Sequence, residues 1–130
     1  MRSYDVGVAS LVIDAPAKWT DNLLSQHTVP DVMSVTNGVT RRISHAGLLR
    51  LAVTRELHAT VGLSVAGALA AAGRLLEPAN AGVIAIGHIS VGIDLAALEN
   101  RVQERLALAL ESAPRPRRGR PRKLGRRRLE

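Results

Sequence analysis

Residues that stop helices or reverse the chain recur at short intervals along this sequence. These breaks are Asp14-Ala15-Pro16, Val29-Pro30, Asn37-Gly38, Gly62-Leu63-Ser64, Pro78 and Pro114. Proline lacks a backbone donor and disfavours helix in the residue before it, whereas Asn-Gly suits a two-residue turn. The chain is therefore restricted to short helices and small hairpins, and no apolar run approaches the length of a membrane span.

Apolar residues at helical spacing predict five helices between these breaks, over about 6–13, 16–26, 45–60, 65–77 and 95–112. Asp14, Ser44, Ser64 and Asp94 stand where they can cap the last four, and Gly62 can end the helix over 45–60. In the second helix the residues expected to face inward are Trp19, Leu23 and Leu24.

Two hairpins are predicted. β-branched runs at 32–36 and 39–43 flank Asn37-Gly38, the dipeptide that a type I′ turn favours. A second, smaller hairpin is expected over 81–94, with Gly87-His88 at its turn. The expected fold class is mainly α with short β-hairpins.

The core must be aliphatic, because aromatic residues make up only 2% of the chain and apolar residues 46%. With Trp19 and Tyr4 alone, an aromatic cage for a cationic ligand is nearly excluded. Cysteine is absent, which rules out disulfides, thiolate metal sites and cysteine nucleophiles.

Positive charge is concentrated at the C-terminal end. Residues 1–113 carry nine Lys and Arg against ten Asp and Glu, a net charge of −1, whereas residues 114–130 carry nine against one, a net charge of +8. The sum is the +7 of the whole chain. A cationic tail on a nearly neutral body predicts a polyanionic partner, of which nucleic acid is the commonest.

The tail contains a run that resembles the AT-hook, whose core is Arg-Gly-Arg-Pro. Its residues are Arg117, Arg118, Gly119, Arg120, Pro121, Arg122 and Lys123. Glycine lets the backbone approach the floor of the minor groove, arginine is attracted to the narrow groove of A·T tracts, and proline fixes an extended form in advance. The alternative interpretation is a solvated polycation or a localisation signal.

The order of the elements resembles the MerR family of winged-helix bacterial regulators over residues 4–77. Val8-Ala9-Ser10-Leu11 is similar to the first helix, Ala15-Pro16 to the start of the recognition helix, and Val29-Pro30 to its exit. Asn37-Gly38 with Arg41-Arg42-Ile43-Ser44 is similar to the wing, with one additional residue. The series Leu48, Arg55-Glu56-Leu57 and Gly62-Leu63-Ser64 is similar to the helix and linker that follow.

The resemblance implies a winged helix-turn-helix that contacts double-stranded DNA. The residues it assigns to DNA are Ala17, Lys18, Asn22 and Gln26 on the recognition helix, and Asn37, Gly38, Arg41 and Arg42 on the wing. Asn and Gln can contact adenine edges, and guanidinium groups bind phosphates. The recognition helix departs from the Arg-rich family pattern, because it offers only Lys18 and also carries Asp21. Without the resemblance, the paired arginines are surface cations that solvate a strand.

The last helix carries an apolar stripe at Leu95, Leu98, Val102, Leu106 and Leu110. We expect this stripe to hold a homodimer, since a DNA-binding module of this size usually reads two half-sites. The competing interpretation is that the helix folds back on the Ala- and Gly-rich helix over 65–77 within one chain.

No catalytic constellation is found, and we expect no enzyme activity, cofactor or metal site. No small-molecule effector is evident in the sequence. The four histidines, at 27, 45, 58 and 88, do not have metal-ligand spacing, and Gly62-Leu63-Ser64-Val65-Ala66 lacks the last glycine of a nucleophile elbow.

We therefore expect three parts: a winged helix-turn-helix over 1–77, a hairpin and self-association helix over 78–113, and a disordered basic tail over 114–130. The predicted function is that of a cytoplasmic, nucleoid-located transcriptional regulator that binds DNA, with A·T-rich sites favoured by the tail. A nucleoid-associated or excisionase-like architectural protein, an antitoxin-type interaction module and an RNA binder remain as alternatives.

Overall fold

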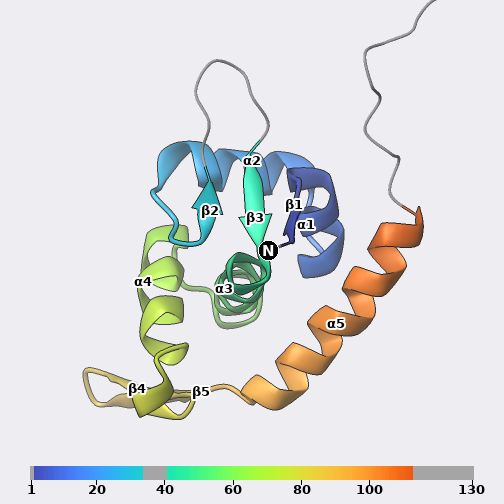
Figure 1. The fold of residues 1–130 in the computed structure, drawn as a ribbon. Coiled ribbons are helices and arrows are strands. Elements are labelled where there is room, and N and C mark those ends of the chain that lie inside the picture. The colour runs from blue at the N-terminus through green and yellow to red at the C-terminus, as the bar shows by residue number, and fades with distance from the viewer. Residues whose placement is uncertain (1, 34–40, 113–130) are drawn as a thin grey trace, which may run out of the picture.

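The computed structural model of this chain describes residues 2–33 and 41–112, and this part of the chain is mainly helical. α3 lies at the centre, and the other helices and two small antiparallel sheets surround it (Figure 1). The helices are α1 (Val6–Ile13), α2 (Ala17–Gln26), α3 (His45–Glu56), α4 (Val65–Leu75) and α5 (Leu95–Ser112). The strands are β1 (Ser3–Tyr4), β2 (Val32–Met33), β3 (Arg42–Ser44), β4 (Val83–Ile86) and β5 (Ile89–Gly92).

α1 and α2 are joined by the short turn that the sequence predicts. The Asp5 carboxylate accepts a hydrogen bond from the backbone N–H of Val8 at 2.9 Å and caps α1. Asp14 then ends α1 with a positive φ of 57°, which aspartate tolerates better than most residues. α2 begins at Ala17, one residue later than expected, because Pro16 holds the extended cap position.

The crossing of α1 and α2 is fixed by a buried hydrogen bond. The Ser10 hydroxyl donates to the Thr20 hydroxyl at 2.9 Å, and both side chains are buried. Trp19 packs against the core, as its predicted inward position requires, but it is only half-buried, and Thr20 beside it is fully buried. Leu23 and Leu24 are buried as expected.

β3 is the central strand of the first sheet, with β1 on one side and β2 on the other. Ile43 pairs with Tyr4 of β1 and with Val32 of β2, both antiparallel, and it is fully buried. Over the described residues, the β2–β3 pairing confirms the predicted antiparallel partners, Val32 with Ile43 and Met33 with Arg42. β1 was not predicted. The predicted tip, Asn37-Gly38, lies outside the described residues.

α3 lies at the centre of the fold, and the helix expected over 45–60 is not a single α-helix. Ser44 caps it by accepting from the N–H of Gly47 at 3.1 Å, as predicted. From Leu57 to Val61 the chain forms a π-helical turn, and Gly62 ends it with a φ of 90°. A π turn of this kind is rare and has no propensity signature in the sequence.

α4 packs closely on α3 because its inward residues are small. The buried face consists of Ala68, Ala71, Ala72 and Leu75. Ser64 caps this helix as predicted, but the helix stops two residues earlier than expected, and Pro78 begins a 3₁₀ turn over Pro78–Asn80. The β4–β5 hairpin follows, with Gly87-His88 at its turn as predicted.

α5 begins and ends where the sequence predicts, with the Asp94 carboxylate accepting from the N–H of Ala97. Its apolar stripe packs on α1 and α3 of the same chain, and Leu98, Val102 and Leu106 are buried there. The assignment of these three residues to a dimer interface is therefore wrong. The alternative of packing on α4 is also wrong, since the principal neighbours are α1 and α3. Leu95 is half-buried, and Leu110 is 44% exposed.

The packing of α5 also corrects the expected division of the chain at residue 77. Leu98, Val102, Leu106 and Ala109 belong to the same core cluster as the residues of α1, α3 and α4. Residues 78–112 therefore close the core of the preceding segment rather than forming a second unit. Residues 113–130, including the basic tail, lie outside the described residues.

Candidate nucleic-acid interface

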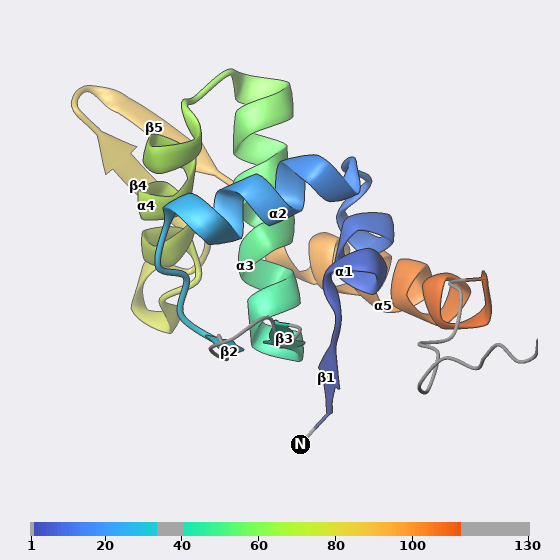
Figure 2. The same ribbon diagram turned by 90° about the horizontal axis from the view of Figure 1, so that it is seen from above.

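The outer face of α2 carries the polar residues that the sequence assigns to DNA. Lys18, Asn22 and Gln26 are spaced by four, so they share one face of the helix, and all three are exposed. Ala17, Asp21 and Ser25 form the neighbouring row on the same side, also exposed. The buried residues of α2, Thr20, Leu23 and Leu24, lie on its other side, and α1 is its principal neighbour. α2 lies across one side of the molecule (Figure 2).

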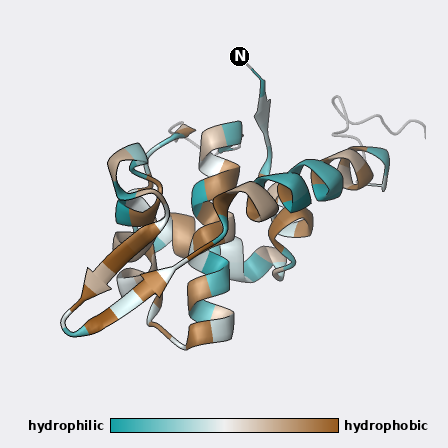
Figure 3. Ribbon diagram, turned by 90° about the horizontal axis from the view of Figure 1, so that it is seen from below, coloured by the Kyte–Doolittle hydropathy of each residue, from teal (hydrophilic) through white to brown (hydrophobic). Residues whose placement is uncertain are grey.

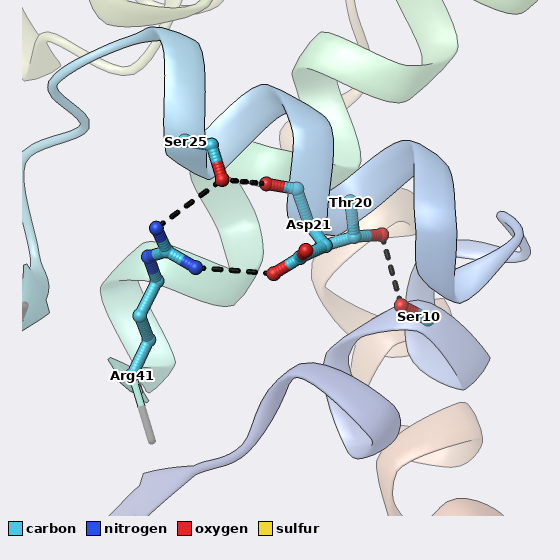
Figure 4. A network of polar contacts seen from close by, with 5 residues as sticks. All are labelled: Ser10, Thr20, Asp21, Ser25 and Arg41. Carbon is cyan, nitrogen blue, oxygen red and sulfur yellow. Dashed lines mark hydrogen bonds and ion pairs between the residues drawn. The ribbon is translucent and has the colours of Figure 1, made fainter. Parts of the chain in front are cut away.

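Arg41 bridges from the start of β3 to the second row of α2. Its guanidinium donates to Asp21 Oδ1 at 3.0 Å and to Ser25 Oγ at 3.3 Å (Figure 4). Ser25 in turn donates to the Asp21 carbonyl at 2.8 Å. The carboxylate that departs from the family pattern is thus neutralised by the predicted wing residue. Because the Arg41–Asp21 pair is partly exposed, it contributes only about 0–1 kcal/mol to the stability of the fold. Either side chain can therefore exchange its partner at low cost.

Arg42 has a different environment, although it is the next residue along the strand. Its guanidinium donates from Nε to Ser3 Oγ at 3.0 Å and from an Nη atom to the Ser3 carbonyl at 2.7 Å. These bonds hold β1 against β3. Successive side chains on a strand point to opposite faces, so the two arginines face opposite ways: Arg41 toward α2 and Arg42 toward β1.

Of the predicted DNA contacts, the structure brings together Lys18, Asn22, Gln26 and Arg41, with Ala17 at the start of the same helix. It separates Arg42 from them. Asn37 and Gly38 of the wing, and all the tail residues from Arg117 to Lys123, lie outside the described residues.

Two contacts that the sequence did not predict join Trp19 of α2 to Arg55 and His58. The Arg55 guanidinium of α3 lies 4.8 Å from the centroid of the Trp19 ring, and the His58 ring lies 5.7 Å from it on another side. His58 Nδ1 is 2.8 Å from the Leu63 carbonyl and donates to it. Arg55 and His58 are three residues apart and share a helical face, which was visible in the sequence, but nothing local identified Trp19 as their partner.

The other described arginines with nearby acids lie away from α2. Arg50 is 3.8 Å from Asp31, and Arg105 is 4.0 Å from Asp14. Arg101 donates to Glu56 at 2.8 Å and so holds the pKa of that carboxyl below its usual range, helped by Thr60 and opposed by partial burial. The Glu56–Arg101 pair lines a hollow of about 240 Å³ between α1, α3 and α5.

Among the described residues there is no group of three or more His, Asp or Glu side chains that could hold a metal ion. His45 Nε2 lies 3.1 Å from a Glu99 oxygen, which is a pair rather than a ligand set. In the same part of the chain, no helix has the length and apolar content that crossing a membrane requires.

Comparison with known proteins gives no relative on which an assignment could rest. The chain matches no protein-family model, no curated protein and no solved structure.

Proposed function

We propose that this chain is a winged helix-turn-helix protein that binds double-stranded DNA and acts as a transcriptional regulator at the nucleoid. One observation carries the proposal: α2 presents Lys18, Asn22 and Gln26 on a single exposed face, beside Arg41, the residue that precedes β3. A helix of ten residues with its buried face on α1 can enter the major groove with this outer face forward.

Three parts of the chain have distinct roles in this proposal. Asn22 and Gln26 contact base edges, because an amide both donates and accepts and so pairs with adenine. Lys18 contacts a phosphate near the start of α2. The tail, with a net charge of +8 over residues 114–130, supplies most of the attraction to the phosphate backbone.

Arg41 resolves the difficulty that Asp21 poses for this function. An acid on a helix that approaches phosphates is repulsive, but the guanidinium at 3.0 Å cancels its charge. The same contact joins Arg41, the residue that precedes β3, to α2. Because the pair is weak and partly exposed, it orients Arg41 toward α2 without fixing it rigidly.

The test begins with selection of bound sequences from random double-stranded DNA by the full chain. Fluorescence anisotropy on the selected site then compares Asn22→Ala and Gln26→Ala with the wild type. Each loss of a base contact should weaken binding by about 1–3 kcal/mol and relax selectivity at one position. The matched control is Gln103→Ala, an exposed glutamine on α5 that should bind as the wild type does. Equal affinities for all four proteins would refute the role of α2.

The role of the tail is tested by removing residues 114–130. If the tail contacts six phosphates, the slope of log affinity against log salt should fall by roughly five units. The selectivity ranking among sites should persist, because α2 is intact. An unchanged slope would mean that the tail does not touch DNA.

A second candidate, an architectural DNA-binding protein with little sequence choice, is favoured by the composition of α2. Its outer face has one lysine, and its acid and the neighbouring arginine neutralise each other. A ratio of specific to non-specific affinity near one in the selection experiment would identify this candidate.

A further inference from the structure

The β4–β5 hairpin extends an apolar face beyond the body that it packs on. Residues opposite one another in an antiparallel pair share a face, and so do residues two apart, so Ile84, Val91, Ile86 and Ile89 lie on one side. Ile84 is buried and Val91 half-buried against the core. The next pair toward the turn is not covered: Ile86 is 39% and Ile89 is 67% exposed.

The figures place this uncovered pair at the end of a projection. The hairpin runs past α4, on the side of the molecule away from the C-terminal end of α5 (Figure 1). In the view from below, the ribbon of these two strands has the colour of hydrophobic residues over most of its length up to the turn (Figure 3). Val83, on the opposite face, is also 54% exposed.

The hairpin lacks the features that usually protect exposed strands. Residues 81–93 contain no Asp, Glu, Lys, Arg or Pro. Soluble proteins commonly place lysine, proline or an inward-pointing charge on such strands to prevent association. The ribbon packs on the core through Ile84 and Val91 only, and the two uncovered isoleucines toward its turn, Ile86 and Ile89, favour coverage by another surface.

We propose that the tip of this hairpin is where two copies of the chain associate, with Ile86 and Ile89 of each copy packed against the same face of the other. A two-fold interface brings the same patch of both copies together, and this apolar face, with no Asp, Glu, Lys or Arg in residues 81–93, meets its own copy without like-charge repulsion. The undescribed end of the chain is a poor occupant, because residues 113–130 carry nine basic side chains. Residues 1–113 have a net charge of −1, so charge repulsion between two copies of this part of the chain is small.

The inference stands on the hairpin alone, although a dimer would also supply the two half-site readers that the proposed function calls for. The strength of the association follows from the size of the interface. Interfaces of standard size bury roughly 800 Å² per partner, and the tip side chains offer far less. Association is therefore weak and depends on protein concentration.

Sedimentation velocity without DNA tests the proposal over micromolar to millimolar concentrations. The wild-type mass should rise from 13.9 kDa toward twice that value. Ile89→Lys, which places a charge on the apolar face, should raise the dissociation constant at least about tenfold. Ser90→Lys is the matched control: it places the same charge one residue along, on the opposite exposed face, and should associate as the wild type does. Circular dichroism checks that all three chains are equally folded.

Three results would overturn the proposal. A wild-type chain that stays monomeric at every concentration would mean that the apolar face of the hairpin does not join two copies and is covered by a different protein. Undiminished association of Ile89→Lys would place the interface elsewhere. Equal loss in Ser90→Lys would mean that any charge on the hairpin suffices, so that the isoleucine face is not the contact. Because no DNA is present, none of these outcomes depends on the proposed function.

Discussion

Two leucines one turn apart on α5 distinguish a helix that closes the core from a helix that joins two chains. Leu106 is 8% exposed and packs with α1 and α3, whereas Leu110 is 44% exposed. Both belong to the same apolar stripe, so an intermolecular stripe would use them alike. We predict that Leu106→Ala strongly destabilises the folded chain and that Leu110→Ala does so only slightly.

The magnitude follows from the burial of each side chain. Truncating a buried leucine to alanine costs about 2–5 kcal/mol, because transfer free energy is lost and a cavity remains. For a domain of about a hundred ordered residues, each kcal/mol lowers Tm by roughly 4–8 °C. A cost of about 3 kcal/mol at Leu106 therefore lowers Tm by roughly 12–24 °C. At Leu110, close to half of the side chain already faces water, and the cost should stay near 1 kcal/mol.

Thermal unfolding followed by circular dichroism measures both variants, at one protein concentration so that any association affects them equally. Urea unfolding should give an unchanged m-value, since each variant exposes the same surface on unfolding. Equal shifts in Tm for the two variants would refute the assignment of α5 to the core. So would a Leu106→Ala chain whose Tm matches the wild type but whose mass is halved.

Two further predictions concern stability. A Cβ added at Gly47 would lie 2.7 Å from the Asp31 carbonyl oxygen, so Gly47→Ala should cost about 1–3 kcal/mol in urea unfolding, whereas Gly7→Ala, whose Cβ meets nothing closer than 3.4 Å, should be neutral or stabilise by up to about 1 kcal/mol. The hydrogen bond from Arg101 lowers the pKa of Glu56 in the folded chain. The ionised carboxylate therefore stabilises the fold at a pH above its unfolded-state pKa, and this stability is lost as the pH falls through the lower folded-state pKa. The Tm difference between the wild type and Glu56→Gln should therefore be small and positive at pH 7 and shrink as the pH falls below the unfolded-state pKa of the carboxyl; a difference that grows on acidification would contradict this.

Three helix starts were predictable because local chemistry sets them. The expectation that Asp14 caps α2 is wrong, because Pro16 takes the cap position and Asp14 instead ends α1. Ser44, Ser64 and Asp94 each accept a hydrogen bond from a backbone N–H three residues later, and that preference is present in the sequence itself. Asp14 and Gly62, with positive φ, mark helix ends for similarly local reasons. The hairpin turn at Gly87-His88 was predictable in the same way.

Apart from the π-helical turn over Leu57–Val61, the features that the sequence did not predict depend on residues distant in sequence. The periodicity of α5 predicted that one face is buried, but it could not say whether the covering surface is α1, α4 or another chain. β1 is two residues long, and it exists because Ser3 bonds Arg42, 39 positions away. Likewise Trp19 stands beside Arg55 because two helices cross there. In the candidate interface, the sequence identified the exposed residues of α2 but not the pairing of Asp21 with Arg41.

The charge pairs within the body bear on how this chain would bind DNA. Four described arginines lie within 4.0 Å of a carboxylate, and a fifth lies over Trp19. Guanidinium groups committed in this way add little attraction for phosphates, in keeping with the net charge of −1 over residues 1–113. In the proposed function, long-range attraction therefore belongs to the tail, while the outer face of α2 discriminates among sequences. Affinity and selectivity would then respond to different changes: salt and truncation act on the first, and substitutions at Asn22 and Gln26 act on the second.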